Sequence, residues 1–280
     1  MLSDQCDERQ PLSGLGLTAL AIARSRAEEH DRPDRLFADP LAQLFLPSGG
    51  TVGGGGSSEF MRGYFALRTR FFDDCVRGMA ESGCRQVVLL GAGLDTRAFR
   101  MGWPAGARLF ELDLPDTLAH KEKVLVERGA VASCHRVVIP ADLRTDWLDL
   151  LVEHGLRSDQ PTAWLAEGLL MYLTEEENRA LLTAVGALSG QGSMLAVEHV
   201  NPETLALPQF QPVLDAFARI GAPWRSAVHD PHRWLAASGW RAEVTDPAVL
   251  ARGLGRPVPP AMDPEVIGAA RLWLIRATWP

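Results

Sequence analysis

Short apolar runs alternate with longer amphipathic segments along most of this chain. The apolar runs have the length of strands and lie at 87–90, 109–112, 135–139, 162–166 and 193–197. The segments between them repeat apolar residues at helical spacing, at 116–128, 146–154 and 174–190, and a shorter helix is expected from about Asp95. Strands and helices in this order predict an α/β protein with a largely parallel, doubly wound sheet and right-handed crossovers.

Both ends of the chain depart from this alternation. Three helices are predicted before the first strand, at 15–29, 40–46 and 60–82, and the Gly/Ser run at 48–58 is expected to be a mobile surface loop. After the fifth strand, residues 202–237 predict a helical insert, followed by strands at 240–245 and 271–279, at least one of them antiparallel at the sheet edge. We therefore expect an N-terminal helical cap over 1–82 and an α/β core over 83–280 that carries the insert.

Composition narrows the class of protein. A chain of 280 residues with a net charge of −7 and no basic run is not typical of a nucleic-acid binder, and no apolar stretch has the length of a membrane helix. Four widely spaced cysteines and a polar, acidic N-terminus without secretory character predict free thiols and a cytoplasmic protein. His229 and His232 lack a third ligand nearby in the sequence, so no metal site is expected.

The first strand leads into a glycine turn that indicates a nucleoside ligand. Gly91 and Gly93 allow close approach of the backbone, and Asp113, 22 residues after Gly91, ends the second strand where it can bind a ribose diol. Thr96 replaces the third glycine of the dinucleotide motif, and no lysine is present to meet a phosphate. S-adenosylmethionine (SAM), which has a ribose and an adenine but no phosphate, fits this pattern. The plain alternative is a tight β–α turn beside a surface acid.

Several longer motifs then resemble one family. In order along the chain they are TALAIARSRAEEHDRPDRLFADPLAQLF, LRTRFFDD, LLGAGLDTRAFR, FELDLP, PADLR and WLAEGLLMYL. Together they resemble the leucine carboxyl methyltransferase family, and especially its bacterial branch of polyketide O-methyltransferases of the tetracenomycin type. The resemblance is continuous over residues 15–200. It implies a Rossmann-like class I methyltransferase sheet with a cap of N-terminal helices and a helical insert, and SAM as the cofactor.

The resemblance also implies where SAM is held. Arg68 would bind the methionine carboxylate, for which a guanidinium fork is well suited, and Arg70 is the weaker candidate. The ribose would lie on Asp113, with Glu111 as second choice. The remaining SAM contacts that the motifs imply are Gly91, Gly93, Asp142 and Leu143 (the last two at the adenine) and Glu167. Taken singly, each of these carboxylates has the alternative role of a surface or capping group.

The acceptor is less well defined by the sequence. A carboxylate acceptor is ionised at neutral pH and needs no base, whereas a phenol needs one. His199 and Tyr172 are the candidate catalytic residues, although a histidine at a strand end often only bonds to backbone. Arg225, Trp224 and Glu198 are candidate substrate contacts. The aromatic residues of the insert favour a flat or apolar acceptor.

Several functions are compatible with these residues. The leading one is a SAM-dependent O-methyltransferase that makes the methyl ester of a small natural-product or polyketide acid, as in antibiotic biosynthesis. The alternatives are methylation of a phenolic hydroxyl, methylation of a protein C-terminal carboxylate, a SAM-binding protein without catalysis, and a dinucleotide oxidoreductase. The expected partner is a small aromatic or apolar carboxylic acid, with neither nucleic acid nor membrane involved.

Overall fold

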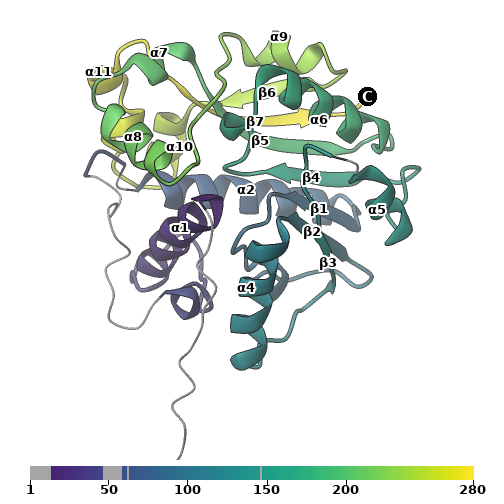
Figure 1. Cartoon of the computed structure of the whole chain (residues 1–280). Coiled ribbons are helices and arrows are strands. Elements are labelled where there is room, and N and C mark those ends of the chain that lie inside the picture. Colours follow the sequence, from purple (N-terminus) through teal and green to yellow (C-terminus); the bar gives the residue numbers. More distant parts are fainter. Residues whose placement is uncertain (1–13, 47–58, 62, 146) are drawn as a thin grey trace, which may run out of the picture.

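A computed structural model describes residues 14–46, 59–61, 63–145 and 147–280. The Gly/Ser run at 48–58 lies outside the described residues, so the prediction of a mobile loop there is not addressed. Helices and strands alternate as the apolar pattern predicts, and one sheet runs through the middle of the molecule (Figure 1). The predicted α/β class and doubly wound sheet are confirmed.

The sheet has seven strands in the order β3-β2-β1-β4-β5-β7-β6. The first five strands are parallel to one another, and β7 lies antiparallel between β5 and β6. Their bounds are β1 Gln86–Leu90, β2 Arg108–Asp113, β3 His135–Pro140, β4 Thr162–Ala166, β5 Met194–Val200, β6 Arg241–Thr245 and β7 Leu272–Thr278. The order reverses between β1 and β4, and in open α/β sheets this switch point is where a ligand binds.

Helices cover both faces of the sheet because the central strands are apolar on both sides. All five residues of β1 are buried. One face packs on α5 Leu148–Glu153, α6 Glu175–Ala187 and α9 Pro231–Ala236. The other packs on α2 Tyr64–Glu81 and α3 Arg97–Arg100, while α4 Pro115–Glu127 lies toward the β3 edge. A capping box begins α6, with Thr174 and Glu177 bonded to each other's backbone N–H.

The region beyond β5 forms a helical layer at one end of the sheet (Figure 1). It contains α7 Pro202–Ala206 and α8 Gln211–Arg219 from the predicted insert, and α10 Pro247–Gly253, η4 Pro260–Met262 and α11 Pro264–Ile267 between β6 and β7. All of these pieces except α11 share an apolar cluster with the start of α2 and with η2 Glu59–Met61. The helices between β6 and β7 were not predicted. Toward α4 lie α1 Gly14–His30 and η1 Ala42–Phe45.

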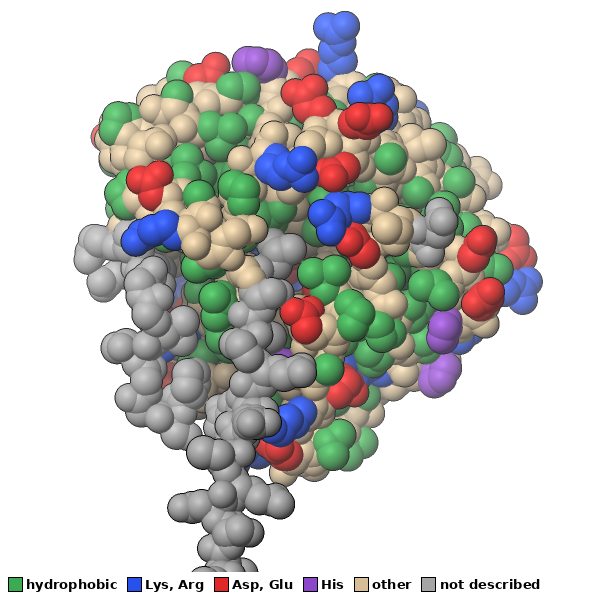
Figure 2. Space-filling model, viewed as in Figure 1, with side chains coloured by type: hydrophobic (Ala, Val, Ile, Leu, Met, Phe, Trp, Pro, Cys, Tyr) green, Lys and Arg blue, Asp and Glu red, His purple; other side chains and the backbone are tan. Residues whose placement is uncertain are grey.

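Acidic and basic side chains are interspersed over the face in Figure 2, with small apolar areas between them. In the described part of the chain, no helix has the length and apolar character that a bilayer crossing requires. The described cysteines, Cys75, Cys84 and Cys134, are free thiols.

Candidate active site

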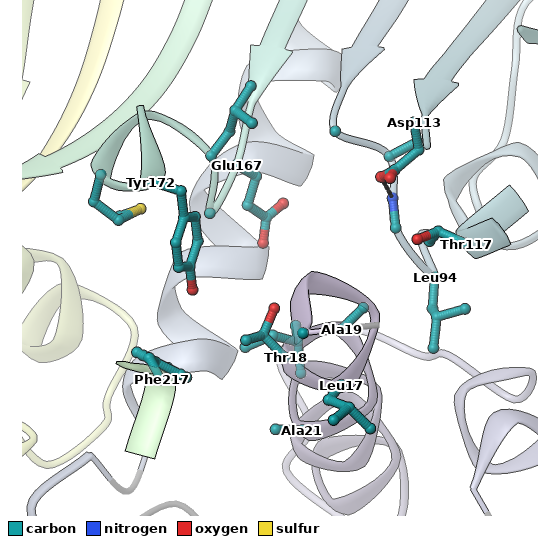
Figure 3. A pocket seen from close by; sticks show the side chains of 18 of the residues that line it. Leu17, Thr18, Ala19, Ala21, Leu94, Asp113, Thr117, Glu167, Tyr172 and Phe217 are labelled. Atoms are coloured by element: carbon teal, nitrogen blue, oxygen red, sulfur yellow. Dashed lines mark hydrogen bonds between the residues drawn. The ribbon is translucent and has the colours of Figure 1, made fainter. Parts of the chain in front are cut away.

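A cavity of about 1000 Å³ opens at the carboxyl ends of β1, β2 and β4. Asp113 and Glu167 approach it from the strand ends, and α1 closes it from the opposite side with Leu17, Thr18 and Ala21 (Figure 3). One stripe of α8, which includes Ala216 and Phe217, completes the wall. The volume is at the upper end of small-molecule sites, which is enough for a cofactor and a second substrate together.

The glycine turn brings backbone to the cavity as predicted. Gly91 and Gly93 both have positive φ, at 69° and 47°, and Ala92 N–H donates to Leu112 O at 2.9 Å. A Cβ on Gly91 would stand 3.2 Å from the Leu169 side chain. Glycine is therefore required at this turn by both conformation and space.

Asp113 is held rigidly beside this turn. Its Oδ2 accepts from Gly93 N–H at 2.6 Å and its Oδ1 from Leu114 N–H at 2.7 Å, and it lines the cavity. Burial raises the pKa of the carboxyl, and the two backbone donors act in the opposite sense. Each oxygen keeps a further lone pair, so the carboxylate can accept from the two hydroxyls of a ribose.

The cavity wall also carries polar atoms that protein groups leave unsatisfied. The hydroxyls of Thr69 and Thr117 are buried and make no hydrogen bond with any described residue. Buried polar groups are normally paired, so such atoms at a cavity wall are suited to a ligand with its own donors and acceptors. Together with Asp113 and the glycine turn they fit a nucleoside that carries an amino-acid arm, such as SAM.

Arg68 lies at the centre of the polar end of the cavity. Its Nε donates to Glu167 Oε1 at 3.0 Å and its Nη1 to Glu198 Oε1 at 2.7 Å; Nη2 makes no hydrogen bond to a described residue. The Tyr64 hydroxyl donates to the other oxygen of Glu198. Burial alone would lower the pKa of Arg68, but Glu198 and Glu167 raise it, so the guanidinium stays charged. The structure thus joins Arg68, Glu167 and Glu198 at one site, while Arg70 pairs with Asp74 outside the cavity.

Asp142 and Leu143 line the cavity beyond the end of β3. Asp142 is paired with Arg144 at 2.5 Å, and hydrogen bonding to Arg144 lowers the pKa of the carboxyl. Leu143 packs partly against the core. A carboxylate beside an apolar side chain suits a purine, as the resemblance implies.

The far end of the cavity is aromatic. Tyr172 meets Phe217 edge to face with ring centroids 6.2 Å apart, and Phe217 stacks on Trp224 at 6.0 Å. Figure 3 shows Tyr172 directed toward Thr18 and Phe217. Burial raises the pKa of Tyr172, so its hydroxyl is a donor and not a base at neutral pH. Arg225 lines the mouth, but its side chain is paired with Glu177 at 3.1 Å.

The structure corrects two of the predicted site residues. Glu111 does not reach the cavity: it is fully buried between β2 and α4, where it binds Lys121 at 2.7 Å and Arg136 at 2.7 Å. His199 does not lie past the fifth strand but within β5, and it faces away from Glu198 because successive strand residues point to opposite faces. His199 Nδ1 accepts from Val200 N–H, its Nε2 meets Ser226 Oγ at 3.3 Å, and its ring contacts Trp234. Neither residue lines the cavity.

Several residues of the site were not predicted, and Arg97 is the one with the most ion pairs. Arg97 lines the cavity and binds three carboxylates. The signal in the sequence is a pair of arginines in TRAFR, a short segment beside apolar strands, where unpaired charges would be costly. Among the described residues, no group of three or more His, Cys, Asp or Glu side chains is arranged to hold a metal ion.

Known structures share this fold. The crystal structure of a candidate methyltransferase from Thermobifida fusca matches with a TM-score of 0.62 at 17% identity, covering 98% of this chain and 96% of that chain. Magnesium protoporphyrin IX methyltransferase from Synechocystis, solved with bound S-adenosylhomocysteine (SAH), matches with a TM-score of 0.51 at 13% identity, covering 93% and 100%. The chain has the class I methyltransferase fold.

Comparison of the sequence identifies the family, whereas the structural neighbours show only the fold. The model of the leucine carboxyl methyltransferase family matches residues 19–186. A protein of Parafrankia sp. named as a candidate SAM-dependent methyltransferase is 46% identical, over 89% of this chain and 84% of its own length. The chain belongs to the leucine carboxyl methyltransferase family, and it is a SAM-dependent methyltransferase.

Replacing Asp113 with alanine is expected to weaken SAM binding by about 1.5–3 kcal/mol, the range for a hydrogen bond to a charged group. The reason is that its two oxygens, fixed by the backbone N–H groups of Gly93 and Leu114, are placed to accept from the ribose hydroxyls. Calorimetric titration with SAM measures the loss. Asp116→Ala, on the exposed first turn of α4, is the control and should bind as the wild type does. An Asp113→Ala protein within twofold of wild type would remove Asp113 from the site.

Proposed function

We propose that this chain is an O-methyltransferase that converts a carboxylate of a small aromatic or apolar acid into its methyl ester. The observation that carries the proposal is the absence of a base: the described cavity lining contains no histidine, lysine or cysteine. Its carboxylates are bonded to arginine or backbone donors, as at Asp113, Asp142 and Glu167. An acceptor that is already ionised at neutral pH needs no proton removed. A phenol would need a base within hydrogen-bond reach.

The residues of the cavity have distinct parts in this reaction. SAM supplies the electrophilic methyl group on its sulfonium. Asp113 and the glycine turn hold the nucleoside, and the Arg68 and Glu167 pair faces the amino-acid arm. Holding two reactants in line lowers the barrier by up to about 7–11 kcal/mol, which makes orientation the main task of the protein.

The acceptor is held at the aromatic end in this proposal. Its apolar body packs between Ala216 and Phe217 of α8 and Ala21 of α1, all at the cavity wall. The Tyr172 hydroxyl, protonated at neutral pH, donates to the acceptor carboxylate and turns one oxygen toward the methyl group.

The test is methyl transfer to a matched panel of aryl carboxylic acids and phenols of equal size. We expect transfer to acids only, with a product that alkali hydrolyses back to the acid, and a kcat that is flat from about pH 6 to 9. Transfer to phenols with a rate that climbs through this range would contradict the ester proposal and leave the methyltransferase assignment intact.

A pair of variants on α8 tests where the acceptor lies. Ala216→Phe fills the proposed acceptor space and should raise the KM for the acid at least tenfold, with SAM affinity unchanged. Ala218→Phe is the matched control, because Ala218 is exposed on the same helix and does not line the cavity. Equal effects of both variants would show that the acceptor does not contact this face.

A further inference from the structure

Arg97 is a buried arginine that joins three carboxylates from separate parts of the fold. Its Nε donates to Asp73 of α2 at 2.7 Å, its Nη1 to Asp95 in the loop after β1, and its Nη2 pairs with Glu167 at the end of β4 at 2.8 Å. The Arg97 side chain is only 2% exposed. The guanidinium is planar, so fixing one edge on Asp73 fixes the direction of the other two donors.

The three carboxylates that Arg97 binds differ in their position relative to the cavity. Asp95 and Glu167 both line it, whereas Asp73 is fully buried and does not. Asp95 is further held by Arg97 N–H, which donates to its Oδ1 at 2.6 Å. Burial alone would raise the pKa of Asp95, but Arg97, together with more distant basic groups such as Lys121, lowers it to about 2. Arg97 therefore keeps a negative charge at a fixed place on the cavity wall.

Glu167 is held from two sides. Arg68 donates to Oε1 and Arg97 pairs with Oε2, so the plane of the carboxylate is set by two arginines. Figure 3 shows Glu167 and Asp113 well apart along the strand-end side of the cavity, at the ends of different strands. If the ribose lies on Asp113, the amino-acid arm of the cofactor extends toward Glu167, where an ammonium group would meet a fixed acceptor.

We propose that Arg97 is a positioning residue that orients Glu167 and Asp95 toward the ammonium of the methionine arm. The proposal rests on the SAM site described above, and it is independent of which acceptor is methylated. Arg97 would then act on the amino-acid end of the cofactor and leave the nucleoside end alone. This difference between the two ends separates a positioning role from a merely structural one.

The experiment compares two ligands by calorimetry. SAH carries the amino-acid arm, and 5′-methylthioadenosine has the same nucleoside without it. Arg97→Lys, which keeps the charge but loses the planar fork, should weaken SAH at least tenfold and change methylthioadenosine by less than twofold. Arg100→Lys is the matched control: Arg100 lies on the same short helix, is 4% exposed and also binds Asp73, but does not line the cavity. It should change both ligands by less than twofold.

A double-mutant cycle shows whether Arg97 acts through Glu167. Glu167→Gln alone should also weaken SAH selectively, and the double variant should lose little more than either single one. If Arg97→Lys does not fold, Asp73→Asn replaces it, because it frees the anchored edge of Arg97 while Arg97 itself stays; the same selective loss of SAH is expected. Equal loss of both ligands, or fully additive losses in the cycle, would overturn the proposal. Wild-type protein that binds neither ligand would overturn the SAM site as well. Failure of ester formation alone would leave both the SAM site and the positioning role of Arg97 intact.

Discussion

Replacing Arg68 with methionine is expected to lower the free energy of unfolding by about 3–5 kcal/mol, the cost of breaking a buried ion pair from one side. The change leaves Glu198, which is only 1% exposed, without its arginine partner, while Glu167 keeps its ion pair with Arg97. Urea unfolding followed by circular dichroism measures the loss. Because methionine fills much of the space of the arginine stem, the loss reports mainly on the unpaired charge of Glu198.

Two further variants test this explanation. Arg77→Met, on the same helix, removes an ion pair with Asp74 in which both side chains are well exposed, and it should change stability by less than about 0.5 kcal/mol. Adding Glu198→Gln to Arg68→Met removes one stranded charge and should recover part of the loss. No recovery would indicate that Arg68 stabilises the fold by packing alone.

His199 is expected to make the protein sensitive to acid, because its side chain must stay neutral where it is buried. Burial lowers the pKa of His199 to about 4, from an ordinary 6.5. The unfolded chain therefore binds a proton between these two values while the folded chain does not. The contribution of the neutral His199 to the free energy of unfolding is fully present above pH 6.5. It is lost progressively as the pH falls toward 4, by about 3 kcal/mol in all.

The measurement is urea unfolding of wild type and His199→Gln between pH 4 and 8. The wild type should lose about 3 kcal/mol more than the variant over this range, whereas His229→Gln, which alters an exposed histidine, should follow the wild type. His199→Gln should also retain methyl transfer, since His199 lies outside the cavity. A dead enzyme that is fully folded would restore His199 as a catalytic residue.

The strands and the glycine turn could be predicted because local sequence determines them. Strand β4 has the predicted bounds, since an apolar run buried on both faces stands out from its flanks. The short helices α10 and α11 between β6 and β7 could not be predicted in this way, because four to seven residues are too few to show a helical period. Their starts at Asp246-Pro247 and Asp263-Pro264 are the signals that were available, an N-cap aspartate followed by proline.

The site residues also divide into those that local sequence determines and those that depend on tertiary contacts. Asp113 was predicted because it ends a strand, a position visible in the sequence. His199 was misplaced because β5 extends to Val200 by pairing with β7, about 75 residues further along the chain. Glu111 shares a strand face with Asp113, but α4 brings Lys121 over it, a tertiary contact that strand alternation does not reveal.

The position of β7 between β5 and β6 bears on how the chain is made. During synthesis β6 leaves the ribosome before β7, which is its one partner among the described strands, so its hydrogen-bonding edge stays open until β7 has emerged. Open strand edges recruit other chains, and nascent domains are exposed to this for as long as translation lasts. Newly made chains stalled before Leu272 should therefore need a chaperone that shields β6, and release of the last strand should be the step that ends this need.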